Sequence, residues 1–285
     1  SEMCIRDRRK MMMTLVETLQ QFPVKSVEID GHKQSYREAG TGEHYLVLLH
    51  GISSGSGSWV KQLQDLSHHF HIIAWDAPGY GSSDALTTLQ PNAEDYAQRL
   101  AGLFEHLKIK KAIVVGHSLG ALQASAFARR YPDDVETLIL ANVAQGYQRY
   151  PVEQQAEVYN KRPKMLAELG NQGLAQSRGP HLTYLKKPQT LELIGQVMQN
   201  LNLGGFTQAS YLLAHDEIRN YLTDLAVPCV MVSGLNDSIT PPQAIAALAK
   251  EIQCQNYIEI GEAGHLSYVD QPTIFNDIIV SAQQH

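Results

Sequence analysis

A serine, Ser118, lies between Gly116 and Gly120, and this spacing suits a nucleophile on a tight turn. The β-branched run before it, residues 113–115, predicts a buried strand, and residues 119–130 have the composition of a helix. A serine on so sharp a turn has a strained backbone, and the glycines remove clashes that Cβ atoms two positions away would cause. Because a serine hydroxyl is a weak nucleophile without a base, the chain is expected to supply a histidine, an orienting acid and an oxyanion hole.

Two further polar residues follow strand-like segments later in the chain. Asp237 comes after the apolar run 229–232, and His265 comes after the segment 256–260. Loops at the carboxyl ends of parallel strands share one edge of a sheet, so we expect both side chains on the same edge as Ser118. The chain order of the predicted catalytic groups is serine, aspartate, histidine.

The elements that position these residues alternate between strand and helix. Strands that are apolar on both faces and separated by helices predict an α/β fold, a mostly parallel sheet with helices on both faces, opened here by an antiparallel hairpin at Asp30-Gly31. The predicted strands are 24–29, 33–38, 45–49, 72–75, 112–115, 137–140, 229–232 and 256–260, and the helices are 58–66, 93–107, 119–130, 242–252 and 273–282.

One long segment, residues 145–216, has no convincing strand. Helical patterns recur there over 152–169, 189–201 and 206–213, which predicts a helical insertion into a core of residues 24–144 and 217–285. Residues 1–23 form a leader that we expect to be disordered or an artificial addition, because its first ten residues are charged and lack apolar periodicity.

Together these motifs resemble the α/β-hydrolase fold family, in which nucleophile elbow, acid and histidine follow in this order. His50-Gly51, with Trp59 beyond it, is similar to the family's oxyanion-loop motif, and residues 76–84 are similar to its D-x-P-G-x-G-x-S turn. The resemblance covers nearly everything after Val24 and implies a twisted sheet with the insertion as a cap over the site.

The mechanism that the resemblance implies can also be argued physically. His265 would take the Ser118 proton during attack on an acyl carbon, while Asp237 holds the imidazole tautomer. The backbone N–H groups of Ile52 and Leu119 would receive the developing oxyanion. Substrate would contact residues of the loops and the cap, although amphipathic helices must also bury a stripe for their own packing. The substrate-binding candidates are His50, Gly51, His117, Tyr147, Met165, Phe206 and Leu266.

Other residues could fill the same roles. Asp76 and Asp84 are alternative acids, but the glycines around them favour turn and packing roles. Some family members carry the acid after the strand corresponding to 137–140, where this chain has Asn142 and no carboxylate. The histidines near residue 70 favour a solvated loop over a metal site, so neither a metal nor a cofactor is predicted.

Subfamilies can be compared through single residues. Haloalkane dehalogenases and epoxide hydrolases have an aspartate where Ser118 stands, and meta-cleavage carbon-carbon hydrolases often have Asn and Trp where this chain has His117 and Leu266. The run 263–272 is similar to carboxylesterases and 3-oxoadipate enol-lactonases. We predict a cofactor-independent serine hydrolase of small esters or lactones; the alternatives are a carbon-carbon bond hydrolase and a non-catalytic small-molecule receptor.

The composition of the chain limits the classes of binding partner that we expect. The 285 residues are 44% hydrophobic and carry a formal charge of −6, which gives no support for nucleic-acid binding. No apolar run approaches the ~20 residues of a membrane span. Three scattered cysteines suit a reducing compartment. We therefore expect a cytoplasmic monomer or homodimer that acts on a small molecule.

Overall fold

One eight-stranded sheet organises the structure, a computed structural model that describes residues 13–283. The strands lie in the order β1-β2-β4-β3-β5-β6-β7-β8. β1 and β2 are antiparallel, β2 pairs antiparallel with β4, and the remaining pairs are parallel. This confirms the predicted sheet and its antiparallel hairpin. The strands are β1 (Lys25–Ile29), β2 (His32–Ala39), β3 (Tyr45–Leu49), β4 (His71–Trp75), β5 (Ala112–His117), β6 (Val135–Ala141), β7 (Cys229–Gly234) and β8 (Asn256–Ile260).

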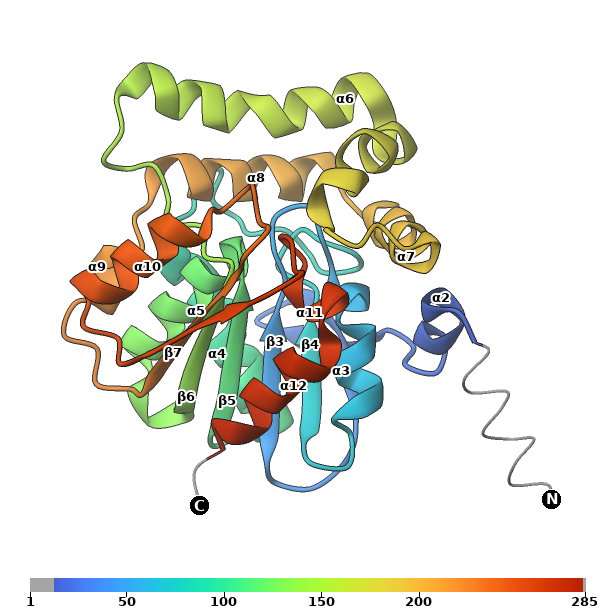
Figure 1. Ribbon diagram of the computed structural model, residues 1–285, viewed down its shortest axis with the longest axis vertical. Coiled ribbons are helices and arrows are strands. Elements are labelled where there is room, and N and C mark those ends of the chain that lie inside the picture. The colour runs from blue at the N-terminus through green and yellow to red at the C-terminus, as the bar shows by residue number, and fades with distance from the viewer. Residues whose placement is uncertain (1–12, 284–285) are drawn as a thin grey trace.

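Helices cover both faces of the sheet (Figure 1). α4 (Ala93–Leu107) and α5 (Leu119–Arg130) pack against each other on one face, and α3 (Val60–Asp65) and α12 (Pro272–Ser281) pack on the other. Because both faces are covered, β5 is buried along its whole length, which explains its unbroken apolar sequence. The other core helices are α9 (Arg219–Leu222), α10 (Pro242–Glu251) and α11 (Ser267–Asp270), with 3-10 turns η1 (Ser56–Trp59) and η2 (Pro132–Asp134).

Three of the four helices between β6 and β7 lie across the carboxyl ends of the strands (Figure 1). They are α6 (Val152–Leu182), α7 (Pro188–Met198) and α8 (Leu203–His215), and α6 packs against both others. The sequence predicts a helix that ends at Leu169. The structure instead continues, after a break at Gly170 (φ 70°, ψ 173°), into a second helical half over residues 171–182. Helix propensity alone does not predict this second half, because Gly173 and Pro180 are poor helix formers.

The part of the expected leader that the structure describes, residues 13–23, is ordered. Residues 1–12 lie outside the described residues, but α2 (Leu15–Leu19) is a short helix whose first turn is capped by Thr14, which accepts a hydrogen bond from the Glu17 amide at 3.1 Å. Leu19 is buried, and α2 contacts α3 and α7. The burial of this apolar side chain orders the segment. Within residues 13–283 no helix combines the length and the apolar character needed to cross a bilayer.

Candidate active site

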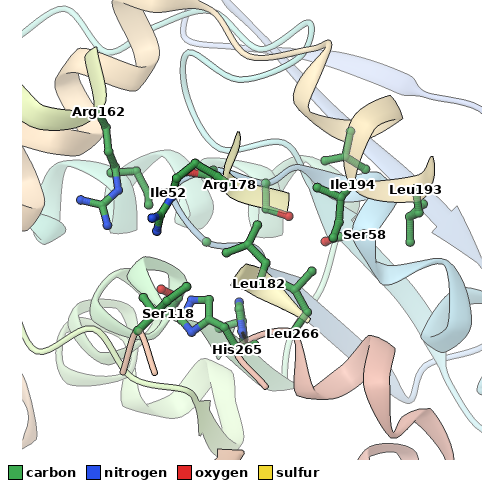
Figure 2. Close-up of a pocket in the computed structure, with 16 residues that line it drawn as sticks. Ile52, Ser58, Ser118, Arg162, Arg178, Leu182, Leu193, Ile194, His265 and Leu266 are labelled. Carbon is green, nitrogen blue, oxygen red and sulfur yellow. Dashed lines mark hydrogen bonds between the residues drawn. The ribbon is translucent and has the colours of Figure 1, made fainter. Parts of the chain in front are cut away.

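The three predicted catalytic side chains meet at the carboxyl edge of the sheet. Ser118 follows β5, Asp237 follows β7 and His265 follows β8, and β6 lies between the first two of these strands. All three residues are buried, with exposed fractions of 6%, 4% and 6%. Figure 2 shows the His265 ring beside Ser118, below the helices that cross this edge.

The turn at Ser118 is as tight as its glycines predict. Ser118 has φ 56° and ψ −117°, a strained conformation for a residue with a side chain. A Cβ on Gly116 would lie 2.3 Å from the Gly120 carbonyl oxygen, and one on Gly120 would lie 2.3 Å from the Leu49 carbonyl oxygen. Both distances are far below van der Waals contact, so glycine is required at both positions for the serine to stand at the strand end.

Asp237 orients His265. The Nδ1–H of His265 donates to Oδ2 of Asp237 at 2.9 Å, which leaves Nε2 as the unprotonated nitrogen. Oδ1 of the same carboxylate accepts from the backbone amides of Ile239 at 2.9 Å and Thr240 at 3.1 Å. Burial raises the pKa of Asp237, but the charge and hydrogen bond of His265 and the other donors outweigh it, so the pKa lies well below its usual range. Asp237 is therefore a carboxylate at neutral pH.

Two further donors to Asp237 were not predicted from the sequence. Thr240 donates its hydroxyl to Oδ2 at 2.6 Å, and the side-chain amide of Asn142 donates to the same oxygen at 2.9 Å. Asn142 is itself held by Ser267, whose hydroxyl donates to Asn142 Oδ1 at 2.6 Å. The one signal in the sequence was the position of Asn142 at the end of β6, where some related sites have their acid.

Two buried histidines hold the surrounding loops. His117 Nε2 donates to the His265 backbone carbonyl at 2.6 Å, and its Nδ1 would lie 3.4 Å from a Cβ on Gly51. His50 Nδ1 donates to the Gly51 carbonyl at 2.8 Å, and its Nε2 accepts from the Ala77 amide at 3.0 Å. Burial lowers the pKa of both, to about 3 for His117. Both side chains are thus neutral structural groups near the site.

Neither predicted oxyanion donor has a competing acceptor for its amide within residues 13–283. Leu119 is the first residue of α5, so its N–H has no carbonyl one turn earlier in the helix. Across residues 13–283 the N–H of Ile52 is in no hydrogen bond, whereas its carbonyl accepts from the Tyr80 hydroxyl at 2.5 Å. The loop is thereby fixed with its N–H available for a ligand.

Asp76 and Asp84, the alternative acids, have structural partners. Asp76 accepts from the Ser56 amide at 2.9 Å and from the Ser35 hydroxyl at 2.8 Å, and Asp84 accepts from the Lys33 amide at 2.6 Å. These bonds tie the loops after β3 and β4 to β2. Throughout residues 13–283 no group of three or more His, Cys, Asp or Glu side chains has an arrangement that could hold a metal ion.

Two adjoining cavities reach Ser118. The inner cavity, about 50 Å³, is walled by apolar side chains of α6 and α7 and by Leu266, and the outer cavity is about 510 Å³. Of the predicted substrate-binding residues, Gly51, His117 and Leu266 line the inner cavity and Tyr147 lines the outer one.

The remaining three predicted substrate-binding residues line neither cavity. His50 supports the loop instead, Met165 is half-buried, and Phe206 is fully buried in the core. Two residues that the sequence did not single out, Arg162 and Arg178, do line the inner cavity (Figure 2).

Comparisons with known proteins agree with this geometry. A carbamate hydrolase RutD, described as putative, from Pantoea ananatis is 26% identical over 246 residues, 82% of this chain and 86% of that protein. The 3-oxoadipate enol-lactonase 2 of Acinetobacter baylyi is 23% identical, over 82% of this chain and 86% of that protein. A thermophilic esterase from Thermogutta terrifontis, solved with malate bound, superposes with a TM-score of 0.80 at 26% identity, covering 90% of this chain and 97% of that one. The family model described as alpha/beta hydrolase fold matches residues 45–272, and the chain belongs to this family.

Proposed function

We propose that the protein is a cofactor-independent serine hydrolase that cleaves small esters or lactones through an acyl-enzyme on Ser118. The observation that carries the proposal is the hydrogen bond from His265 Nδ1 to Asp237. It fixes the tautomer in which Nε2 is free to accept a proton, on a ring that lines the same cavity as Ser118. The helices α6 to α8 would act as the cap of this site.

In this mechanism His265 Nε2 removes the Ser118 proton as Oγ attacks the acyl carbon. The Asp237 carboxylate stabilises the imidazolium that forms, and the amides of Ile52 and Leu119 donate to the oxyanion. His265 returns its proton to the leaving alcohol. Water then attacks the acyl-enzyme with His265 again acting as base, which releases the acid and regenerates Ser118.

The names of related proteins support ester or lactone substrates. They include the enol-lactonase and the esterase already described. A carbon-carbon bond hydrolase is the second candidate, because the 2-hydroxy-6-oxononadienedioate/2-hydroxy-6-oxononatrienedioate hydrolase of Burkholderia vietnamiensis is 25% identical over 86% of this chain. Assaying a ring-cleavage dienoate beside an ester separates the two.

The role of Ser118 is tested with Ser118→Ala and, as a control, the exposed Ser177→Ala. We expect a fluorophosphonate to label the wild type and the control at one serine, and Ser118→Ala to lose both labelling and at least ~10³-fold in ester or lactone turnover. If Ser118→Ala hydrolysed these substrates at the wild-type rate, Ser118 would not be the nucleophile. Labelling without turnover across a panel of esters, lactones and dienoates would instead favour a receptor.

A further inference from the structure

Two arginines of α6 face the cavity that contains Ser118 and His265. Arg162 lies before the break in this helix and Arg178 after it, and both guanidinium groups point toward the interior above Ser118 (Figure 2). The rest of the cavity wall is apolar or uncharged, with Leu182 and Leu266 among its members, and no aspartate or glutamate of residues 13–283 lines it. The cavity therefore has two positive charges at one end of an apolar wall.

Neither guanidinium has a partner among residues 13–283. In the part of the chain that the structure describes, neither Arg162 nor Arg178 makes a hydrogen bond or an ion pair, whereas Arg219 pairs with Glu217 at 2.7 Å and Arg99 donates to the Gln34 side chain at 3.2 Å. Both cavity arginines are half-buried. Burial lowers the pKa of Arg162, and the neighbouring charge of Arg178 lowers it further. Two partly desolvated like charges that lack a counter-ion are unfavourable until an anion binds between them.

The break at Gly170 brings these two side chains together. Arg162 and Arg178 are 16 residues apart, which on one straight helix corresponds to a separation of roughly 160° around the axis. They would then project on nearly opposite faces. The non-helical backbone of Gly170 redirects the second half of α6, so both side chains reach the same cavity.

We propose that Arg162 and Arg178 bind a carboxylate of the substrate, so that the preferred substrates are esters or lactones carrying a free acid group. Guanidinium groups match carboxylate geometry and can donate two parallel hydrogen bonds, which fixes orientation as well as charge. This substrate class rests on the proposed hydrolase function and deepens it. With the carboxylate held under α6, the apolar wall would receive the carbon chain and Ser118 the acyl carbon.

The test compares an ester that carries a free carboxylate with its counterpart in which that carboxylate is methylated. Monomethyl succinate carries its charge on the acyl side of the ester, and acetoxyacetate carries it on the alcohol side. Dimethyl succinate and methyl acetoxyacetate are the neutral counterparts. We expect the wild type to prefer the charged member of one pair at least ~10-fold in kcat/KM. Arg162→Gln and Arg178→Gln should each lower kcat/KM for that member by ~10- to 100-fold, and change that for the neutral member by less than ~3-fold. Lys164→Gln, which removes an exposed charge of the same helix, should change neither.

A second measurement is independent of turnover. Succinate should slow fluorophosphonate labelling of Ser118 in the wild type and in Lys164→Gln, and should have little effect in either arginine variant. Equal rates for charged and neutral esters in all variants, together with no protection by succinate, would overturn the carboxylate site while leaving the serine hydrolase intact. Stronger protection by inorganic phosphate than by succinate would overturn the choice of carboxylate. If the fluorophosphonate did not label the wild type at all, the proposed hydrolase function itself would be wrong.

Discussion

Asn142 connects three loops of the site through one side chain. It is fully buried with φ 47°, and its amide donates to Asp237 Oδ2 at 2.9 Å and to the Gly264 carbonyl at 3.2 Å. Its oxygen accepts from Ser267. Asparagine tolerates this left-handed backbone better than most residues, so both its conformation and its two-sided hydrogen bonding suit the position.

Replacing this donor with a second acid should weaken the orientation of His265. In Asn142→Asp the new carboxylate would face Asp237, remove one hydrogen bond and raise the pKa of Asp237 through like-charge repulsion. We expect kcat/KM for the best ester to fall by roughly 10-fold or more, and the acid limb of its pH profile to move to higher pH. Asn220→Asp, at an exposed position, is the control. An unchanged acid limb with reduced activity would argue that Asn142 has only a packing role.

For single residues, the sequence predicts candidate catalytic groups but does not predict the side chains that hold them in place. Ser118, Asp237 and His265 could be predicted to share one sheet edge because each follows a strand-like run within five residues. The contact between Asn142 and Asp237 joins residues 95 apart in the chain. No local pattern encodes such a contact, because it depends on how two loops pack in three dimensions. The unpartnered state of Arg178 is likewise a property of the folded neighbourhood.

Among the secondary-structure elements, α5 approaches β3 so closely that only glycine fits. A Cβ on Gly120 would meet the carbonyl oxygens of Leu49 and His50 at 2.3 and 2.7 Å, and both are backbone atoms that cannot rotate away. Gly195 in α7 is the opposite case, because a Cβ there meets nothing within 4 Å. The two positions therefore separate the effect of close packing from that of glycine itself.

Substituting these two glycines should change the free energy of unfolding in opposite directions. Gly120→Ala should lower it by roughly 1 to 3 kcal/mol or more, because α5 must move away from β3. Gly195→Ala should raise it by about 0.5 to 1 kcal/mol, since alanine favours the helical backbone more than glycine does and its Cβ would meet no other atom there. Urea unfolding monitored by circular dichroism measures both. A similar change in both variants would show that the close approach to β3 has no energetic weight.

The element boundaries show where sequence patterns lose information. Strands such as β5 were predicted to within two residues because a buried parallel strand must be apolar throughout. The second half of α6 was not predicted, since it contains three poor helix formers and is instead held by packing of buried residues such as Leu174 and Leu182 on the neighbouring helices. Tertiary burial there overrides intrinsic propensity.

For the whole molecule, the buried histidines link stability to pH. His117 is 1% exposed, and burial lowers its pKa to about 3, against ~6.5 in an unfolded chain. Between these values the unfolded state binds one more proton than the folded state at this side chain, so the free energy of unfolding falls as the pH falls. Asp237, whose pKa is lowered by His265 and its hydrogen-bond donors against the opposing effect of burial, loses its contribution only in more acidic solution, below its unfolded pKa of ~3.9.

Between about pH 7 and about pH 5, the wild type should therefore lose roughly 2 kcal/mol more of its free energy of unfolding than His117→Gln. Glutamine keeps an amide donor for the His265 carbonyl but cannot take up a proton. It therefore removes the pH dependence of stability at this position while keeping the hydrogen bond. His68→Gln, at an exposed position, should follow the wild type. Urea unfolding at the two pH values gives the comparison, and a wild-type NMR titration of the His117 ring gives its folded pKa directly. The same loss of free energy of unfolding in all three proteins would contradict this prediction. A His117 ring that titrates near neutrality would also contradict it, because the buried imidazole would then become protonated in the folded protein.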